Sequence, residues 1–504
     1  KGIGGTSGDH IESVIDTSDG GYIVGGYFNS SSIDLGNGIS LTNKGSDDGM
    51  IIKYNASGEV EWAEGIGGSK YDYIKSVAET SDGGYIVGGY FYSRSIDLGN
   101  GISLTNKGLS SFSSDGMVIK YNARGEVEWA EGIGGTSSDE KIESVAETSD
   151  VGYIVVGAFK SSSIDLGNGI SLTNKGSTDG MIIKYNAAGE VEWAEGIGET
   201  RDDYIDSVAG TSDGGYIVGG DFESSSIDLG NGISLTNKGS TDGMVIKYNA
   251  EGNVEWAEGI GEADSEEIES VAETSDGGYI VGGDFYSSSI DLGNGISLKN
   301  KGTYEGMIIK YNSKGEVEWA EGIGGTDFDH IESVSGTSEG GYIVGGYFRS
   351  SSIGLGNGIS LTNKGNEDGM LIKYNAAGEV EWAEGIGESD NDRITSVSET
   401  RDGGYIVGGY FGSNSIGLGN GISLTNKNLG YDDGMLLKIT AKMGVPEVQE
   451  LEVINNRKEF KITTDINEID NVKGGSISGE DKKEYEKIKY GDSSIKEIKM
   501  IPDE

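Results

Sequence analysis

The chain has 504 residues, a formal net charge of −46, 89 glycines and no cysteine. The absence of cysteine excludes disulfides, thiol catalysis and cysteine-ligated metal centres, and the negative charge opposes binding to the phosphate backbone of nucleic acids. No run approaches the roughly 18 apolar residues of a membrane-spanning helix, so the sequence predicts no membrane insertion.

A phrase close to GGYIVGG occurs seven times along the chain at nearly constant spacing. Its tyrosines are Tyr22, Tyr85, Tyr153, Tyr216, Tyr279, Tyr342 and Tyr405. Neighbouring copies are 63 residues apart, except for one interval of 68 residues. A second phrase, EWAEGIG, follows six of the copies. A period of this size indicates one supersecondary unit that is copied and stacked, and seven stacked copies form one large domain.

The first repeat predicts four short strands, joined by turns that contain glycine. The strands are Ile11–Thr17, Tyr22–Phe28, Gly49–Tyr54 and Glu59–Ile66. Tight turns at Ser18–Gly21 and Asn55–Gly58 follow the first and third strands, whereas a long polar segment, 29–48, joins the second to the third. One four-stranded antiparallel meander per repeat is the unit of a β-propeller blade.

The two ends of the repeat array predict a closed ring. The seventh repeat stops after its third strand, Met435–Ile439, and lacks a fourth-strand phrase. The chain begins with Lys1–Gly5, which aligns with the end of the first repeat's fourth strand, Glu64–Gly68. The N-terminal strand is therefore expected to close blade 7 and to remove the free sheet edges that invite aggregation. The sequence predicts an all-β fold, a closed seven-bladed β-propeller of four-stranded antiparallel blades.

The composition changes after Met443, where the glycine phrases end and Lys, Glu and Ile become frequent. Pro446 marks a boundary, so we assign 1–443 to the propeller and 444–504 to a small β-rich C-terminal domain. Alternation at Glu459–Thr463 and Ile495–Met500 predicts strands in that domain. Because the chain begins inside a repeat phrase, we expect a fragment or a processed product, with a truncated C-terminal domain.

Two parts of the sequence resemble known families. The run DGMIIKYNASGEVEWAEGIGG, Asp48–Gly68, resembles the bacterial SBBP repeats, which combine an aspartate, an apolar strand with Lys-Tyr, a glycine turn, Trp-Ala and Gly-Gly. This resemblance covers 1–443 and implies a seven-bladed propeller in an extracellular bacterial setting, without a catalytic motif. The run GGSISGED, Gly474–Asp481, and the following IKYGDSSIKEIKMIPDE resemble β-rich repeats of Gram-positive cell-surface proteins.

One position in the segments between blades is acidic in every repeat. These residues are Asp9, Asp72, Glu140, Asp203, Glu266, Asp329 and Asp392. They lie just before the first strand, which is the innermost strand of a propeller blade, so they are expected near one mouth of the central channel. Two interpretations stay open: a weak cation or polar-ligand site, with calcium as the candidate ion, or turn capping by side-chain hydrogen bonds. We expect added calcium to change thermal stability little, because each blade offers few fixed oxygens. No other cofactor is predicted.

A second acidic position precedes the third strand of every repeat. Its residues are Asp48, Asp115, Asp179, Asp242, Glu305, Asp368 and Asp433. We expect these side chains to cap the long polar segment through local hydrogen bonds, as aspartate commonly does.

Differences in length between repeats fall on one face of the predicted ring. This loop face carries the segments between blades and the long polar segments. Insertions there add Leu109 and Phe112 in the second repeat, and Leu429 and Tyr431 in the seventh. Exposed aromatic residues on a rigid scaffold make effective contacts, so we expect a partner, or another copy of the chain, to bind here. Drift on solvent loops is the alternative, and the opposite turn face, with its SDGG turns, is expected to be inert.

No enzymatic motif accompanies the repeats. The sequence has no Ser-His-Asp set, phosphate loop or dinucleotide fingerprint, and its two histidines, His10 and His330, belong to repeats one and six. We predict a non-enzymatic, extracellular surface protein of a Gram-positive bacterium, acting in binding or adhesion to a protein or carbohydrate, or as a structural module. The alternatives are a self-assembling filament or layer subunit, and a carbohydrate-active enzyme that uses the propeller channel.

Overall fold

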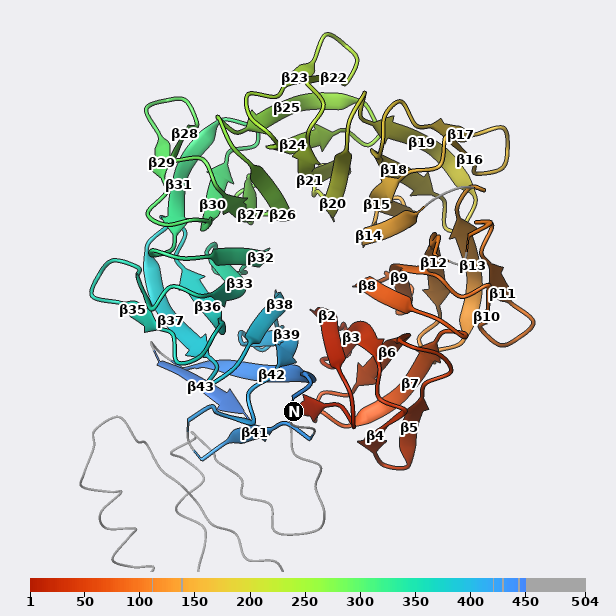
Figure 1. Ribbon diagram of the computed structural model, residues 1–504, viewed down its shortest axis with the longest axis horizontal. Coiled ribbons are helices and arrows are strands. Elements are labelled where there is room, and N and C mark those ends of the chain that lie inside the picture. Colours follow the sequence, from red (N-terminus) through yellow and green to blue (C-terminus); the bar gives the residue numbers. More distant parts are fainter. Residues whose placement is uncertain (111, 137–138, 420, 428–429, 443–444, 450–504) are drawn as a thin grey trace, which may run out of the picture. The chain divides into compact units, whose positions relative to one another are not determined.

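A computed structural model describes residues 1–110, 112–136, 139–419, 421–427, 430–442 and 445–449. The chain divides into two units, Lys1–Glu452 and Val453–Glu504. The tail strands predicted at Glu459–Thr463 and Ile495–Met500 lie outside the described residues. In the first unit, seven antiparallel sheets surround a central opening, which confirms the predicted all-β propeller (Figure 1). No helix in the described part of the chain is long and apolar enough to cross a membrane.

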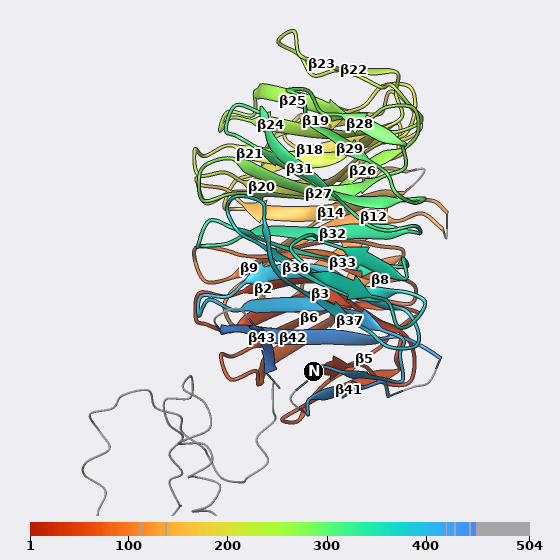
Figure 2. The ribbon, with the colours of Figure 1, turned by 90° about the vertical axis from the view of Figure 1, so that its left-hand side faces the viewer.

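The strands of each blade follow one another from the central opening to the outside of the ring (Figure 1). Figure 2 shows the ring edge-on. The innermost strands are β2 (Asp9–Asp16), β8 (Asp72–Glu79), β14 (Glu140–Glu147), β20 (Asp203–Gly210), β26 (Glu266–Glu273), β32 (Asp329–Gly336) and β38 (Asp392–Glu399). The second strands are β3 (Tyr22–Phe28), β9 (Tyr85–Phe91), β15 (Tyr153–Phe159), β21 (Tyr216–Phe222), β27 (Tyr279–Phe285), β33 (Tyr342–Phe348) and β39 (Tyr405–Phe411).

The third and fourth strands complete the blades. The third strands are β6 (Asp48–Tyr54), β12 (Asp115–Tyr121), β18 (Asp179–Tyr185), β24 (Asp242–Tyr248), β30 (Glu305–Tyr311), β36 (Asp368–Tyr374) and β42 (Asp433–Lys442). The fourth strands of blades 1 to 6 are β7 (Val60–Ile66), β13 (Val127–Ile133), β19 (Val191–Ile197), β25 (Val254–Ile260), β31 (Val317–Ile323) and β37 (Val380–Ile386).

Each long polar segment folds into a small hairpin at the outer edge of the ring, which the sequence pattern did not predict (Figure 1). The hairpins are β4 (Ser32–Gly36) with β5 (Ile39–Thr42), β10 (Ser95–Asp97) with β11 (Ser103–Thr105), β16 (Ser163–Asp165) with β17 (Ser171–Thr173), β22 (Ser226–Asp228) with β23 (Ser234–Thr236), β28 (Ser289–Asp291) with β29 (Ser297–Lys299), β34 (Ser352–Gly354) with β35 (Ser360–Thr362), and β40 (Ser415–Gly417) with β41 (Ser423–Thr425). Most of these strands have three residues, which is too short for alternation to be recognised.

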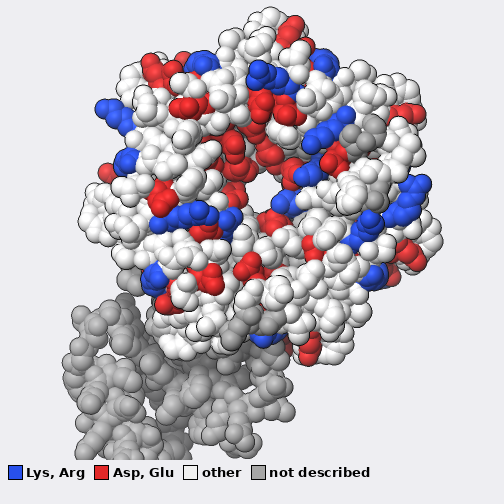
Figure 3. All heavy atoms as spheres, in the orientation of Figure 1, with Lys and Arg blue, Asp and Glu red and all other residues white. Residues whose placement is uncertain are grey.

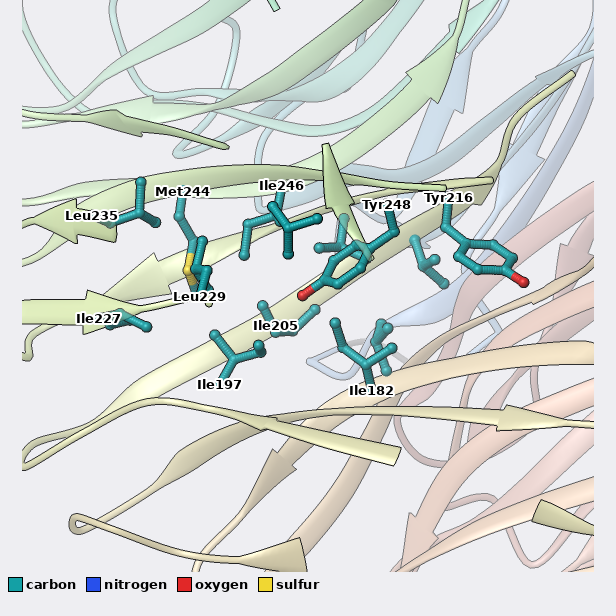
Figure 4. Close-up of a cluster of buried hydrophobic side chains, with 14 of the residues drawn as sticks. Ile182, Ile197, Ile205, Tyr216, Ile227, Leu229, Leu235, Met244, Ile246 and Tyr248 are labelled. Atoms are coloured by element: carbon teal, nitrogen blue, oxygen red, sulfur yellow. The ribbon is translucent and has the colours of Figure 1, made fainter. Parts of the chain in front are cut away.

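The hydrophobic core lies between neighbouring blades. At the junction of blades 3 and 4, Ile182 and Ile197 of blade 3 pack with Ile205, Tyr216 and Met244 of blade 4, and all five side chains are buried (Figure 4). Each blade thus covers the apolar face of the next. This mutual burial is why a single repeat has no core of its own.

Glycine in the second strand lets the next blade approach closely. A Cβ atom on Gly25 would lie 2.7 Å from Val77 Cγ1 and 3.0 Å from Ile74 Cγ2, both on the innermost strand of blade 2. Blade 3 is the exception, because Val156 occupies this position and is buried. The first glycine of the GG pair therefore permits this close approach in the other six blades.

Every innermost strand contains a β-bulge that links it to the next blade. In β2 the pairing with β3 passes from Ile11 directly to Ser13, which leaves Glu12 as the extra residue. The serine after each bulge accepts a hydrogen bond from a valine backbone N–H of a neighbouring innermost strand, at 3.0–3.3 Å. The seven pairs are Val14–Ser396, Val77–Ser13, Val145–Ser76, Val208–Ser144, Val271–Ser207, Val334–Ser270 and Val397–Ser333.

The N-terminal strand closes blade 7, as predicted. In β1 (Gly2–Ile3), Gly2 pairs with Met435 and Ile3 pairs with Gly434 of β42. A further strand, β43 (Val445–Gln449), pairs with the other half of β42, Lys438–Lys442. The outer strand of blade 7 is therefore shared between two segments, and the propeller sheet continues past the boundary predicted at residue 443.

Replacing Ile3 with alanine tests this closure. Ile3 is buried in the core of blades 7 and 1, so we expect the variant to lose about 2–5 kcal/mol of unfolding free energy. Ile66 occupies the equivalent position in blade 1, opposite Gly49, and Ile66→Ala is the matched control. Chemical denaturation should give similar losses for both variants. A loss at Ile66→Ala without one at Ile3→Ala would show that the N-terminal strand does not hold blade 7.

One turn holds a strained residue. Val151 has φ of 67°, whereas the equivalent turn position of the other six blades holds glycine, as at Gly277 with φ of 77°. Positive φ is unfavourable for a β-branched residue, because its Cβ crowds the backbone. The exposed Val151 side chain offers little packing to offset that cost.

Val151→Gly is therefore expected to raise the unfolding free energy by about 1 kcal/mol, after the entropic cost of glycine in the unfolded chain is subtracted. The reciprocal change, Gly277→Val, should lower it by a similar amount, because a Cβ at Gly277 meets no atom within 4 Å and only the backbone strain changes. Thermal denaturation of both variants checks the pair. A destabilised Val151→Gly variant would contradict the strain argument.

Candidate functional site: the central channel

Three side-chain positions per blade lie together beside the central channel. The second residues of the innermost strands are His10, Tyr73, Lys141, Tyr204, Glu267, His330 and Arg393. The fourth residues, which are the bulge residues, are Glu12, Lys75, Glu143, Asp206, Glu269, Glu332 and Thr395. The sixth residues of the second strands pair directly with the second residues of the innermost strands: Tyr27, Tyr90, Ala158, Asp221, Asp284, Tyr347 and Tyr410.

Blades 6, 7, 1 and 2 contribute a continuous belt of rings in stacked, tilted and edge-to-face contacts. Neighbouring ring centroids lie 4.8 Å apart in His330–Tyr347, 4.0 Å in His10–Tyr410, 4.8 Å in His10–Tyr27, 4.8 Å in Tyr27–Tyr73 and 5.1 Å in Tyr73–Tyr90. The Arg393 guanidinium carbon lies 3.9 Å from the centroid of the Tyr347 ring and 5.9 Å from that of Tyr410, which joins blades 6 and 7.

Carboxylates interrupt this belt in blades 4 and 5, where aspartate replaces tyrosine. The acidic cluster consists of Asp206, Asp221, Glu267, Glu269, Asp284 and Glu332. Figure 3 shows Asp and Glu gathered on the rim of the opening over the blades that contain β20 and β26. His330 Nδ1 lies 3.2 Å from Asp284 Oδ1. Among the described residues, no lysine or arginine forms an ion pair with any of these six carboxylates.

Two cationic groups on the other side of the channel already have carboxylate partners, and a third, Lys141, lies 4.9 Å from the centroid of the Tyr90 ring. Lys75 Nζ lies 2.6 Å from Glu12 Oε2, and Arg393 Nε lies 2.5 Å from Glu367 Oε2. Burial lowers the pKa of Lys75, but the negative charges of Glu12 and Glu143 outweigh it and raise the pKa well above its usual value. The channel is therefore asymmetric, with excess negative charge on the side of blades 4 and 5.

Burial and mutual repulsion act together on the acidic cluster. Burial, followed by the negative charge of neighbouring carboxylates, raises the pKa of Asp206, Asp221 and Glu269 well above the usual range. The same two causes raise the pKa of Glu267, with Asp284 as the nearest source of charge. Carboxyl groups in this state favour either a proton or a bound cation.

The first acidic row predicted from the sequence lies inside the wall of the ring. Asp9, Asp72, Glu140, Asp203, Glu266, Asp329 and Asp392 are each 0% exposed. Asp9 accepts hydrogen bonds from Gly5 N at 2.9 Å, Ser30 N at 3.1 Å and Ser30 Oγ at 2.6 Å. These are turn-capping contacts, which connect the end of one blade to the start of the next. Full burial separates the row from the channel mouth.

The second acidic row also caps a segment, as expected. Asp48 Oδ2 accepts a hydrogen bond from Lys44 N at 2.7 Å, while Asp48 Oδ1 is buried and accepts none. Burial raises the pKa of Asp48 to about 6; the Lys44 hydrogen bond lowers it in part, and nearby Asp72 adds to the rise. Burial likewise raises the pKa of Asp115 and Asp179 to about 6.

Buried lysines explain why the SDGG turns vary so little. Lys53 is 1% exposed, and its Nζ lies 2.8 Å from Asp19 Oδ2 and 2.9 Å from Tyr54 O. Burial raises the pKa of Asp19, but hydrogen bonds from Lys53, Thr17 and Gly21 outweigh it and lower the pKa to about 2. The turn face is thus fixed by internal contacts.

The insertion residues are exposed on the loop face. Leu109 is 83% exposed, Phe112 is 81% exposed and Tyr431 is 54% exposed, whereas Leu429 lies outside the described residues. They belong to blades 2 and 7, with blade 1 between them (Figure 1). The structure therefore distributes them along the rim and does not gather them at one point.

Sequence reasoning missed the channel residues, although the repeats contain a signal for them. Aligned innermost strands read DHIES, DYIKS, EKIES, DYIDS, EEIES, DHIES and DRITS, and only the second and fourth positions vary in charge and size. The change from GGYF to GGDF at Asp221 and Asp284 marks the same two blades. Variation at the innermost strand of an otherwise constant repeat is the pattern that points to the channel.

Comparisons with known proteins leave the family open, and no protein-family model matches the chain. It is 22% identical over 439 residues to an uncharacterized WD repeat-containing protein L264 of Acanthamoeba polyphaga mimivirus, covering 72% of this chain and 31% of that protein. It is 23% identical over 166 residues to the regulatory protein FlaEY of Caulobacter vibrioides, covering 32% of this chain and 17% of that protein. The chain thus spans less than a third of the length of either curated relative.

Several solved structures resemble this chain with low TM-scores. Sqt1 from Chaetomium thermophilum matches with a TM-score of 0.38 and 12% identity over 81% of both chains. The Pan2 WD40 domain of Neurospora crassa matches with a TM-score of 0.39 and 10% identity, over 79% of this chain and 86% of that one. The extracellular domain of BT4673 from B. thetaiotaomicron matches with 0.32 and 11%, over 82% and 51%. The resemblance to SBBP repeats stays a prediction.

The raised carboxyl pKa values predict an unusual dependence of stability on pH. Between about pH 4 and about pH 6, the folded chain keeps protons on Asp48, Asp115 and Asp179 that the unfolded chain releases. The unfolding free energy is therefore expected to fall as the pH rises through this window. Asp19 acts in the opposite direction, but only below about pH 4, because its pKa is lowered to about 2.

Urea denaturation at about pH 5 and about pH 7.5 checks this sign. The control is Asp48→Asn, which keeps an oxygen for the Lys44 N–H but cannot ionise, so its difference between the two pH values should be smaller. A chain that is more stable at the higher pH would show that the buried carboxyls do not govern the profile.

Proposed function

We propose that this chain is a non-enzymatic binding module of an extracellular bacterial surface protein, and that its partner binds the loop face. The partner is a protein or a carbohydrate of the cell surface. The resemblance of the repeats to SBBP sequences supports the bacterial extracellular setting, and the absence of a catalytic motif in the sequence supports a binding role.

The distribution of exposed apolar side chains carries this proposal. Large hydrophobic residues that are exposed on the loop face are Tyr71, Leu109, Phe112, Tyr286 and Tyr431; Val151 on the turn face is the one other in the described residues. Lys70 Nζ lies 5.7 Å from the centroid of the Phe112 ring, which places a cation beside the most exposed aromatic. Aromatic side chains of this kind supply most of the energy in protein and sugar recognition.

The residues of the channel also favour binding at the loop face. The second residues of the innermost strands lie next to the strand ends that enter from the loop face, so the acidic cluster opens toward it (Figure 3). Acidic groups at this rim favour a partner that presents amino or guanidinium groups, because charge complementarity guides association. The blades are otherwise nearly identical. The rim and the channel therefore supply the residues that differ between blades and that a partner can recognise.

The test is a double variant, Phe112→Ser with Tyr431→Ser. We expect it to lose binding to arrayed cell-surface glycans or matrix proteins by about tenfold or more, because two exposed anchors are removed. The melting temperature should not change, since neither side chain belongs to a buried cluster. The readout is binding to the same array before and after substitution.

Arg124→Ser is the matched control, because Arg124 is exposed on the turn face of blade 2, the blade that carries Phe112. Loss of binding in the control with retention in the double variant would refute the proposal. Sedimentation analysis of both proteins distinguishes binding to another molecule from self-assembly, in which the partner is a second copy of the chain.

A further inference from the structure

Three carboxylates of blade 5 converge at one point of the channel. Glu267 and Glu269 lie on β26, and Asp284 lies on β27 directly opposite Glu267. Each offers a carboxylate oxygen, and these oxygens all lie within 4.8 Å of one another. Glu267 and Glu269 are two residues apart on the same strand and so lie on the same side of it, and Asp284 is the ladder partner of Glu267.

Asp284 provides an independent sign that this point receives a ligand. Its side chain is 1% exposed, and its Oδ1 faces His330. Its Oδ2 is buried and accepts no hydrogen bond from the described residues. A buried carboxylate oxygen without a partner is costly, so such an oxygen calls for an explanation such as a bound ion. His330 accounts for one oxygen and leaves the other without a hydrogen-bond donor.

The charges around the three carboxylates also favour a bound ion. Asp206 and Glu332 add negative charge on either side of Glu269, and His330 contacts Asp284 and acts on Glu267 as a cation-forming group. One histidine cannot balance three converging carboxylates. A bound divalent cation would balance them, and it would leave room for water, because Glu267 and Glu269 are only partly buried.

We propose that Glu267, Glu269 and Asp284 bind one divalent cation of the size of calcium. Carboxylate oxygens are the ligands that hard cations prefer. Calcium holds oxygens at about 2.3–2.6 Å and so can bridge oxygens up to about 5 Å apart, whereas magnesium, at about 2.1 Å, reaches only about 4 Å. Water from the channel completes the coordination shell. This site shares the acidic cluster with the partner face proposed above, and calcium binding to the chain alone tests the site separately from the partner.

The repeats supply internal comparisons. Blade 4 has Asp206 and Asp221 but Tyr204 in place of the first glutamate, and blade 6 has Glu332 with His330 and Tyr347. Blade 5 is the one blade of the described ring whose three channel positions are all acidic. The predicted acidic row at Asp9 and its equivalents is a different set of residues and takes no part in this site.

Isothermal titration calorimetry on the full chain tests the site, with the protein first stripped by a chelator and CaCl2 or MgCl2 as the titrant at physiological ionic strength. We expect one saturable calcium site and magnesium binding at least about tenfold weaker. Asp284→Asn and Glu269→Gln should each weaken calcium binding by at least about tenfold, the loss typical of even outer-shell partners. Calcium should raise the melting temperature of the unsubstituted chain and not of these variants, in contrast to the small effect expected above from the Asp9 row alone.

Glu143→Gln is the matched control, because Glu143 occupies the bulge position of blade 3 and contributes to the same negative channel. It should keep calcium binding within about twofold, since salt at this ionic strength largely screens charges that do not touch the ion. If Asp284→Asn fails to fold, Glu267→Gln replaces it in the titration, because Glu267 is only partly buried. The absence of a saturable site, or an equal loss in Glu143→Gln, would overturn the proposal. Equal affinity for magnesium would overturn the assignment to an ion of calcium's size.

Discussion

A hydrogen bond between neighbouring innermost strands holds the ring together at its centre. In every blade, the bulge turns a serine hydroxyl toward the next innermost strand, where a valine backbone N–H donates to it at 3.0–3.3 Å. Each bond satisfies a backbone donor that lies between two sheets and would otherwise be buried without a partner. The pair Val14–Ser396 joins the first blade to the last, so the same interaction that spaces the blades also completes the circle.

The bulge also determines what the channel displays. An unbulged strand would alternate strictly, and the side chains at the second and fourth positions would share their face with the sixth. The extra residue shifts this phase, so the valine after the serine is buried and two polar positions per blade remain beside the channel. The framework of serine, valine and glycine contacts is nearly constant, and the variation is confined to positions that the framework does not use. Within the eight residues of an innermost strand, some positions hold the fold and stay constant, and others give each blade its own side chains.

Much of the fold follows from the sequence, because its determinants are local and repeated. The GIGG match between Lys1–Gly5 and Glu64–Gly68 was enough to predict the pairing of Ile3 with β42. The three-residue hairpins and β43 escaped prediction, since their pairing depends on neighbours that no short pattern encodes. The channel acids escaped for a different reason. Alternation in EEIES places Glu267 and Glu269 on one face of the strand, but nothing in it marks that this face borders the channel or that the ladder will skip Glu269.

The glycines that set the distance between blades have a consequence for the number of repeats. A six-bladed ring would open a wider wedge between neighbours, and an eight-bladed ring a narrower one. At Gly282, where an added Cβ would already lie 2.5 Å from Val334 Cγ1, a narrower wedge would bring the backbone itself against the next strand. The contact distance at this glycine thus limits how closely two blades can approach, and it disfavours rings of more than seven copies.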